Sequence, residues 1–504
     1  MKKKLLFQIV SLLVTVAFML TGCSSGQKSP TDSASPEGTN ANSKPGEITI
    51  AFFTLSSQTS GIPEVEAAVS KIAEEKINTK VKFLPISFGS YVQQMNLMNA
   101  SGEKLDLLVS SVFGGPSYSS MAATGQIIPL NDLLEKHGQG ITEVMGPYLE
   151  YSKIDGKVFG IPRTSDLAQG FGVAMRKDLV DKHKIDISTI KTLDDMTPIL
   201  KLIKEKEPGV TPMVQYQPGG ASTPVQKTGI FNILQDGFGV LKYDGDGKTI
   251  VNMFETEEYA KELKRARAWF EAGYIQKDAA TTKDNGNDLI KANRAFAYTT
   301  NLKPDLADQA TKTTGKEMIT VPVTTPVLES TTSFAWSISK NSKDPERAMM
   351  FLNLMYTNPD IVNLLSYGIE GRDYVKASPP FIRYPDGVTA ETVPYGLNLG
   401  WLFGNQLISH VFEGTASDIW SQMEEFNRTS VKSAALGFVY DNAAVKNETA
   451  AVTAVDKEFR LGLETGTLDP DKTLPELNKK LKDAGIERII AEKQKQFDAW
   501  LQSK

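Results

Sequence analysis

The chain has 504 residues, of which 40% are hydrophobic and 23% are charged, and its formal net charge at pH 7 is −5. This is enough apolar material for one large two-lobed body or for two to three domains. A mildly acidic chain lacks the basic stripe that nucleic-acid binding favours, so we expect no nucleic acid among its partners.

The N-terminus has the pattern of an export signal. Lys2 to Lys4 precede an apolar run from Leu5 to Leu20, which is too short to span a membrane comfortably. The run ends in Leu-Thr-Gly-Cys, which resembles the bacterial lipobox, whose cysteine receives a diacylglyceryl group and becomes the new N-terminus. We therefore expect a signal peptide over residues 1–22 and lipidation of Cys23. The other interpretation is a plain signal peptide that a cysteine follows by chance.

Cys23 is the only cysteine of the chain, so no internal disulfide can form and the exported domain depends on its core alone. Residues 23–46 are rich in Ser, Thr, Pro, Gly and Asn, which is the composition of a flexible linker. Together these features predict a domain that a lipid anchors to the outer face of the cell membrane.

The first part of the folded region alternates strands and helices. The hydrophobic patterns predict strands at 47–53, 79–84 and 105–110, with a helix that Pro63 opens and another near 91–99. Strand, helix, strand, helix, strand indicates a parallel sheet covered by helices. Ligands of such sheets bind at the carboxyl ends of the strands, which here are residues 53–57 and 110–118.

The next segments carry a family resemblance. Gly125 to Leu130 reads GQIIPL, Asp155 to Pro162 reads DGKVFGIP with a hairpin turn at Asp-Gly, and a strand at 171–176 ends in RKDLV. This order resembles the extracellular solute-binding proteins of ABC importers. A long amphipathic helix expected at 256–272 ends in WFEAGYIQKD, which is similar to the same family.

The remaining elements are expected in the following places. Strands are predicted at 295–299, 318–323 and 334–339, and a hairpin around 244–247. Helices are predicted at 193–205, near Phe231, and at 344–356, 359–365, 415–435, 449–464 and 474–501. The sequence YGIEGRDY at 367–374, with this helical tail, resembles the lipoprotein A branch of the Gram-positive solute-binding proteins, whose C-terminal region is a domain of its own type.

The resemblance implies an α/β fold of the two-lobed, type II periplasmic-binding-protein kind with a helical C-terminal region. We expect lobe 1 to comprise residues 47–165 and 299–375, and lobe 2 to comprise residues 166–298 and 376–504. The chain would cross between the lobes near Arg163 to Gln169 and near Thr299 to Pro304. The implied function is the capture of a soluble solute in the cleft between the lobes and its delivery to the permease subunits of an ABC transporter.

Catalytic motifs are missing from the sequence. The three histidines stand alone, without the i, i+4 pair of a zinc protease helix, and no G-x-S-x-G elbow occurs. Gly247-Lys248-Thr249 imitates the end of a P-loop, but Lys242 stands where that loop requires glycine. Asp244 and Asp246 imitate a calcium loop, although Lys248 occupies a ligand position. We therefore predict no catalytic residue, no metal and no cofactor.

Sugar recognition needs flat aromatic faces and planar polar groups. Aromatic residues at predicted strand ends or in loops are the first candidates: Phe53, Phe113, Tyr118, Trp336, Tyr367 and Trp401. Core packing is the other interpretation of each, and for Trp336, which lies within a predicted strand, it is the favoured one. The polar candidates for the same site are Ser56, Ser110, Arg163, Asp166 and Glu370.

The solute is predicted to be a carbohydrate, because the family branch is associated with carbohydrate uptake and the aromatic candidates agree with it. A peptide or an amino acid stays open as the alternative, since Arg163 and Asp166 could meet charged termini. A surface-anchored polysaccharide hydrolase is the enzymatic alternative, because a sequence does not reveal whether two carboxyl groups meet across a cleft.

Overall fold

The computed structural model describes residues 44–112, 115–218, 223–397 and 399–504. The predicted signal peptide, Cys23, most of the predicted linker and Phe113 lie outside the described residues. Contacts divide the chain after Lys44, and residues 45–504 form one unit. Among the described residues, no helix is long and apolar enough to cross a membrane.

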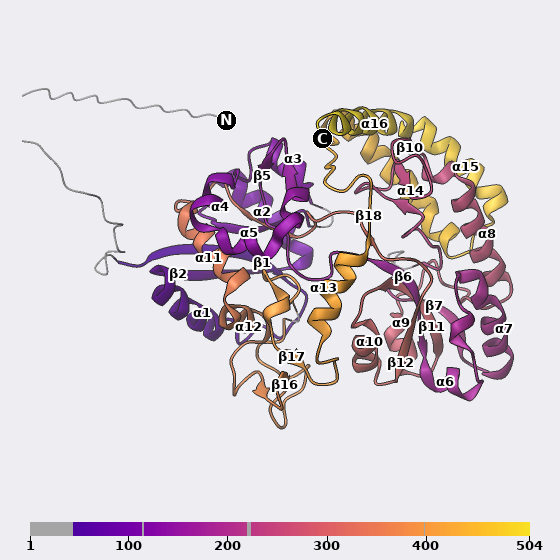
Figure 1. The fold of residues 1–504 in the computed structure, drawn as a ribbon. Coiled ribbons are helices and arrows are strands. Elements are labelled where there is room, and N and C mark those ends of the chain that lie inside the picture. The colour runs from indigo at the N-terminus through magenta and orange to yellow at the C-terminus, as the bar shows by residue number, and fades with distance from the viewer. Residues whose placement is uncertain (1–43, 113–114, 219–222, 398) are drawn as a thin grey trace, which may run out of the picture. The chain divides into compact units, whose positions relative to one another are not determined.

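The first sheet has the order β14-β3-β1-β2, and its strands β1 and β2 are labelled in Figure 1. Its strands are β1 (Gly46–Thr54), β2 (Thr79–Ser87), β3 (Leu107–Ser110) and β14 (Ala335–Ile338). β1 is parallel to β2 and β3, whereas β14 is antiparallel to β3. The helices of this lobe are α1 (Ile62–Ile77), α2 (Phe88–Ser101), α3 (Tyr118–Ala123), α4 (Asn131–His137), α5 (Gln139–Met145), α11 (Pro345–Thr357) and α12 (Pro359–Tyr367). The predicted parallel sheet is therefore present.

The second sheet has the order β12-β6-β11-β7. Its strands are β6 (Gly170–Arg176), β7 (Thr211–Gln215), β11 (Ala295–Leu302) and β12 (Met318–Pro322). β6 is antiparallel to both β11 and β12, and β7 is parallel to β11. The accompanying helices are α6 (Lys177–Lys182), α7 (Met196–Lys206), α8 (Glu257–Glu271), α9 (Gly286–Lys291) and α10 (Leu306–Thr314).

The C-terminal helices are α14 (Lys446–Glu464), α15 (Pro470–Asp483) and α16 (Ile486–Gln502). α14 and α15 pack beside α8, and α16 packs against α14 and α15 (Figure 1). Their core includes Tyr259 of α8, Phe459 of α14, Leu477 of α15 and Ile489 of α16. The small sheet of β8 (Phe231–Asn232), β9 (Val240–Lys242) and β10 (Ile250–Val251) adjoins this core.

Several predicted elements differ from the structure. The segment near Phe231 is the strand β8, because it pairs with β9 rather than forming a helix. The helix expected at 474–501 is two helices, since Gly485 takes a left-handed conformation with φ of 97° between them. The helix expected at 415–435 is shorter, α13 (Ile419–Thr429). The predicted hairpin at Asp155-Gly156 joins β4 (Lys153–Ile154) and β5 (Lys157–Val158), and both turn residues have positive φ.

The expected lobe boundaries also differ from the observed packing. Residues 299–323 are expected in lobe 1, but the end of β11 and the whole of β12 pair with β6 in the second sheet. Residues 376–403 were expected in lobe 2, but Tyr395, Leu399 and Phe403 belong to the core of the first sheet. The small sheet of β15 (Val375–Lys376), β16 (Phe381–Arg383) and β17 (Val411–Phe412) lies in the same part of the chain. The second crossing is therefore near 324–333, and a third follows α13 at 430–433.

Candidate functional site

Three aromatic side chains meet at the carboxyl end of β1. The ring of Phe53 lies 5.7 Å from that of Phe334 and 6.1 Å from that of Trp401, and the rings of Phe334 and Trp401 are 5.4 Å apart. Phe53 is fully buried and Phe334 is 8% exposed, whereas Trp401 is partly exposed. We call these three residues the aromatic floor. Only its outer member, Trp401, has the exposure that a stacking surface for a ligand needs.

The backbone beside the aromatic floor is strained. Ser111, which directly follows β3, has a φ of 57°, and Phe334, which directly precedes β14, has a φ of 56°. The two residues are joined by a hydrogen bond from the Phe334 N–H to the Ser111 carbonyl oxygen at 3.4 Å. A side chain in this left-handed region costs about 1–2 kcal/mol, and such strain is concentrated at functional sites. Two residues at this edge of the sheet therefore hold backbone conformations that disfavour a side chain.

A charged pair flanks the aromatic floor. The guanidinium carbon of Arg163 lies 5.2 Å from the centre of the Trp401 ring, which is a cation–π contact. Its Nη1 donates to Asp166 Oδ1 at 2.8 Å and also to the Ser165 hydroxyl. Burial alone would raise the pKa of Asp166, but Arg163 and Lys303 outweigh it and hold that pKa below its ordinary value. Arg163 Nε is buried and has no hydrogen-bond partner among the described residues.

Polar side chains at the end of the second sheet's strand β11 add to the Arg163–Asp166 pair. Lys303, just after β11, lies 3.8 Å from Asp166 Oδ2 and 3.4 Å from Asp305 Oδ1. Asn301 Nδ2 donates to Gln169 Oε1 at 3.0 Å. The two cations Arg163 and Lys303 are therefore balanced by two carboxylates. The site presents paired charges, amides and one exposed indole rather than an uncompensated charge.

Three predicted site residues are enclosed by the core of the first lobe. The Tyr118 hydroxyl donates to the Ser152 carbonyl at 3.0 Å and accepts from the Phe159 N–H at 2.8 Å. Trp336 Nε1 donates to the Leu402 carbonyl at 2.7 Å, and its side chain is fully buried. Ser110 is fully buried and donates to the Ala335 carbonyl. Their polar atoms bond to the protein itself, which matches the core-packing interpretation.

Three further predicted residues lie apart from the aromatic floor. The Tyr367 hydroxyl donates to the His410 carbonyl at 2.8 Å, and burial raises the pKa of Tyr367 to about 12. The side chain of Glu370 is 49% exposed and pairs with Lys376 at 2.9 Å. Ser56 caps a turn, since its hydroxyl accepts from the Gln58 N–H at 3.0 Å. The structure thus brings together Phe53, Arg163, Asp166 and Trp401 of the predicted set.

Phe334, Lys303 and Asn301 were not predicted as site residues. Phe334 follows Ser-Thr-Thr-Ser and opens a strand pattern, so nothing in the sequence indicates that its backbone is left-handed. Lys303 and Asn301 stand at the carboxyl end of the strand predicted at 295–299, and polar residues at such strand ends are a sequence signal for a ligand site.

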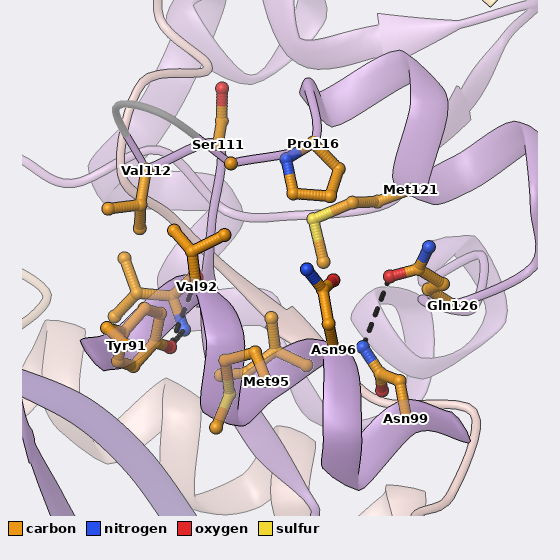
Figure 2. A pocket seen from close by; sticks show the side chains of 13 residues that line it. Tyr91, Val92, Met95, Asn96, Asn99, Ser111, Val112, Pro116, Met121 and Gln126 are labelled. Atoms are coloured by element: carbon orange, nitrogen blue, oxygen red, sulfur yellow. Dashed lines mark hydrogen bonds between the residues drawn. The ribbon is translucent and has the colours of Figure 1, made fainter. Parts of the chain in front are cut away.

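Figure 2 shows a separate pocket in the first lobe, between α2 and the segment that follows β3. Asn96, Asn99 and Gln126 line it together with Met95 and Met121. Asn99 Nδ2 donates to Gln126 Oε1 at 3.2 Å. The pocket volume is about 20 Å³, and a single water molecule needs about 10–15 Å³ on this measure. The pocket can hold about one water molecule and is too small for a sugar ring.

No group of three or more His, Cys, Asp or Glu side chains among the described residues could hold a metal ion. The Asp246 carboxylate, which imitates a calcium ligand in the sequence, accepts hydrogen bonds from the Lys248 and Thr249 N–H groups, each at 2.8 Å. It therefore caps the hairpin turn.

Two sheets, each with its own helices and core, joined by three crossings, define a two-lobed solute-binding protein. Residues 59–360 match the family model for the bacterial extracellular solute-binding proteins, and residues 434–502 match a model described as a domain of unknown function, DUF3502. The chain belongs to the bacterial extracellular solute-binding protein family. The predicted family and the predicted two-lobed fold are thereby confirmed.

The chain is similar to a carbohydrate ABC transporter substrate-binding protein of Streptococcus pneumoniae, with 30% identity over 466 residues, 90% of this chain and 91% of that protein. It also resembles the crystal structure of the N-glycan transport solute-binding protein NgtS of S. pneumoniae, with a TM-score of 0.78, 29% identity, and coverage of 91% of this chain and 99% of that one. The lipoprotein LipO of Bacillus subtilis is 26% identical over 279 residues, 53% of this chain and 51% of LipO.

Proposed function

We propose that the protein captures a soluble oligosaccharide between its lobes and delivers it to the permease subunits of an ABC importer. The observation that carries the proposal is the aromatic floor: Trp401 is partly exposed, rests on Phe53 and Phe334, and has Arg163 5.2 Å from its ring centre. The exposed part of this indole would offer an aromatic surface to the C–H groups of a sugar ring, beside the Arg163 guanidinium that lies over the ring.

The polar groups at the site favour a neutral sugar over a peptide. Meeting the charged termini of a peptide or an amino acid requires a free cation and a free carboxylate. Arg163 and Asp166 already pair with each other at 2.8 Å, and Lys303 lies between Asp166 and Asp305. Gln169 Oε1 accepts from Asn301 Nδ2, so the remaining N–H groups of these two amides would be the planar donors offered to sugar hydroxyls.

The relatives support the same conclusion. NgtS has been crystallised in complex with Man1GlcNAc and with Man5GlcNAc, and these structures superpose on this chain with TM-scores of 0.73 and 0.71. Capture would proceed by population shift, because a ligand that contacts both lobes stabilises the closed arrangement by its differential affinity for it. The chain would then act as a binding protein without turnover.

Anchoring completes the proposal. Lipid on Cys23 would hold the protein at the outer face of the cell membrane, and residues 23–46 would act as the linker. The lipobox of the sequence and the similarity to LipO support this part. In a Cys23→Ala variant, incorporation of a labelled fatty acid should be lost, and persistent labelling would contradict the anchor site.

Thermal-shift measurements test the ligand class. Man1GlcNAc and Man5GlcNAc, together with other neutral oligosaccharides, are compared with di- and tripeptides and amino acids. A ligand at a hundred times its dissociation constant stabilises the fold by about 2.7 kcal/mol. We expect a shift with an oligosaccharide and none with the peptides. A shift with peptides alone would overturn the proposal, and release of new reducing ends from the bound oligosaccharide would support the hydrolase instead.

A further inference from the structure

The three crossings between the lobes are bonded to one another in a ribbon. Gln169 of the first crossing exchanges two backbone hydrogen bonds with Val327 of the second, each at 2.8 Å. The second crossing contains β13 (Val327–Leu328), which pairs in parallel with β18 (Val431–Lys432) of the third. Backbone bonds therefore join the first crossing to the second and the second to the third.

The remaining link, from the third crossing back to the first, is made by one side chain. Asn427 lies near the end of α13, just before the third crossing. Its Oδ1 accepts from the N–H groups of Leu167 and Ala168 at 2.9 and 3.0 Å, and its Nδ2 donates to the Ser165 carbonyl at 2.6 Å. Three residues of the first crossing, Ser165, Leu167 and Ala168, are thus bound by a single amide.

This link is sealed from water. Asn427 is 3% exposed. Leu167 and Ala168 form an apolar cluster with Leu328 of the second crossing and Leu436, which follows the third. Because water cannot replace the amide in this setting, each hydrogen bond that is lost leaves a buried group without a partner. The hydrogen bonds that close the ring of three crossings therefore depend on Asn427.

We propose that Asn427 is the positioning residue of the hinge: it closes the ring of crossings and thereby limits the angles that the lobes sample without ligand. The chemistry selects asparagine. Two N–H groups require an acceptor oxygen and a carbonyl requires a donor on the same short side chain, and an amide supplies both. Aspartate would keep the acceptor but turn an oxygen toward the Ser165 carbonyl.

Asn363 offers a matched control inside the first lobe. It is 5% exposed, and its amide also bonds only to the backbone: Nδ2 donates to the Pro359 carbonyl and Oδ1 accepts from the His410 N–H, each at 2.8 Å. It links α12 to a neighbouring segment of the same lobe and touches none of the crossings. Asn363→Ala should therefore cost stability as Asn427→Ala does, without changing the movement of the lobes.

The test measures the distance between the lobes in the ligand-free full chain. Spin labels are placed on cysteines introduced at the exposed Lys71 of α1 and Lys201 of α7, with Cys23→Ser in every protein, and the distance distribution is recorded by double electron–electron resonance. We expect Asn427→Ala to at least double the width of the distribution and Asn363→Ala to leave it unchanged, although both lower the melting temperature.

An unchanged width in Asn427→Ala, or equal broadening in both variants, would overturn the proposal and leave Asn427 as ordinary core packing. If Asn427→Ala does not fold, the same distance distribution is measured in Asn427→Asp and compared with that of Asn363→Ala. A smaller broadening is expected in Asn427→Asp because the acceptor oxygen is retained. Since no ligand is present, failure here would be distinct from failure of the proposed carbohydrate function.

Discussion

The carboxyl edge of the first sheet and the helical region at 434–502 differ in which residues occupy their left-handed backbone positions. At the edge, Ser111 and Phe334 hold left-handed backbone conformations that disfavour a side chain, and Arg163 Nε is buried without a partner among the described residues. In the helical region, Asp469 caps α15 and the left-handed position between α15 and α16 is a glycine. The buried Lys493 of α16 is fully bonded, to Asp236 and to three carbonyl groups.

We infer from this difference that the sheet edge serves ligand binding and that the helical region serves stability. The left-handed positions of the helical region are glycines, whereas at the sheet edge they are Ser111 and Phe334, and side chains held in such conformations are concentrated at functional sites. Variants in the helical region should therefore change stability and leave affinity alone. Variants at the aromatic floor should do the reverse.

The largest effect is expected for Lys493→Met. The ammonium group is fully buried and lies 2.5 Å from Asp236 Oδ1, so its removal leaves a carboxylate and three carbonyls without their cation. Breaking a buried pair in this way costs about 3–5 kcal/mol. Urea unfolding should show this loss, while oligosaccharide affinity stays at the wild-type value. The double variant Lys493→Met with Asp236→Asn should recover part of the loss. A loss below about 1 kcal/mol in Lys493→Met alone would contradict the stabilising role of the helical region.

Glu329 gives a pH-dependent effect at the second crossing. Burial raises the pKa of Glu329 to about 7, although the hydrogen bond from the Tyr243 hydroxyl opposes the shift. Folding therefore favours the protonated form of Glu329. The contribution of this group to the stability of the folded protein is fully present below about pH 4.5 and is lost as the pH rises through about 7. Glu329→Gln mimics the protonated form.

The variant and wild type should be about equally stable near pH 4.5, and the variant should be more stable at pH 8 by up to about 3 kcal/mol. Chemical unfolding between pH 5 and pH 8 measures this difference. Glu425→Gln serves as the control, because it removes an exposed ion pair with Arg428 that is worth about 0–1 kcal/mol. A difference between Glu329→Gln and wild type that does not change with pH would show that Glu329 is charged throughout this range.

A smaller effect is expected for Tyr367→Phe. The variant loses the hydrogen bond to the His410 carbonyl and keeps the ring. The free energy of unfolding should fall by about 1 kcal/mol, the ordinary net value of such a bond. Affinity for the oligosaccharide should be unchanged. A clear loss of affinity with unchanged stability would return Tyr367 to the binding site.

The smallest effect has the opposite sign. Ser111→Gly removes a side chain from a left-handed position, a gain of about 1–2 kcal/mol, and increases the freedom of the unfolded chain, a cost of about 0.5–1 kcal/mol. The net result should be a gain of about 0.5 kcal/mol. Lys184→Gly, at an exposed residue with φ of 52°, should gain similarly. Only Ser111→Gly should also weaken ligand binding, because it loosens the segment that holds Phe334; equal affinities of the two variants would contradict this.

The sequence predicts a helix or strand well wherever its hydrophobic period and its terminating residues indicate the same element. The strands from Gly46 and Thr79 and the helix from Pro345 follow their hydrophobic patterns closely. The predicted lobe boundaries differ from the observed ones because β12 and the segment around Tyr395 pack on sheets whose other strands lie far away in the sequence. The hydrophobic period of a segment does not indicate which sheet it joins.

The site was predictable only in part, for a related reason. An aromatic residue at a strand end has the same sequence signal whether it faces a ligand, as Trp401 does in our proposal, or the core, as Tyr118 does. The left-handed backbone of Phe334 depends on its bond to Ser111, more than 200 positions earlier in the chain, and no local pattern encodes that pairing.

The most direct test of the aromatic floor as a sugar-binding surface is calorimetric titration of Trp401→Ala with the oligosaccharide that gives the largest thermal shift. The control is Trp420→Ala, which removes another partly exposed indole, one that donates to the Ser409 carbonyl and lies outside the floor. We expect Trp401→Ala to weaken binding by about 2 kcal/mol, roughly thirtyfold, and Trp420→Ala to bind as the wild type does. Unchanged affinity in Trp401→Ala would contradict a sugar-binding role for the aromatic floor.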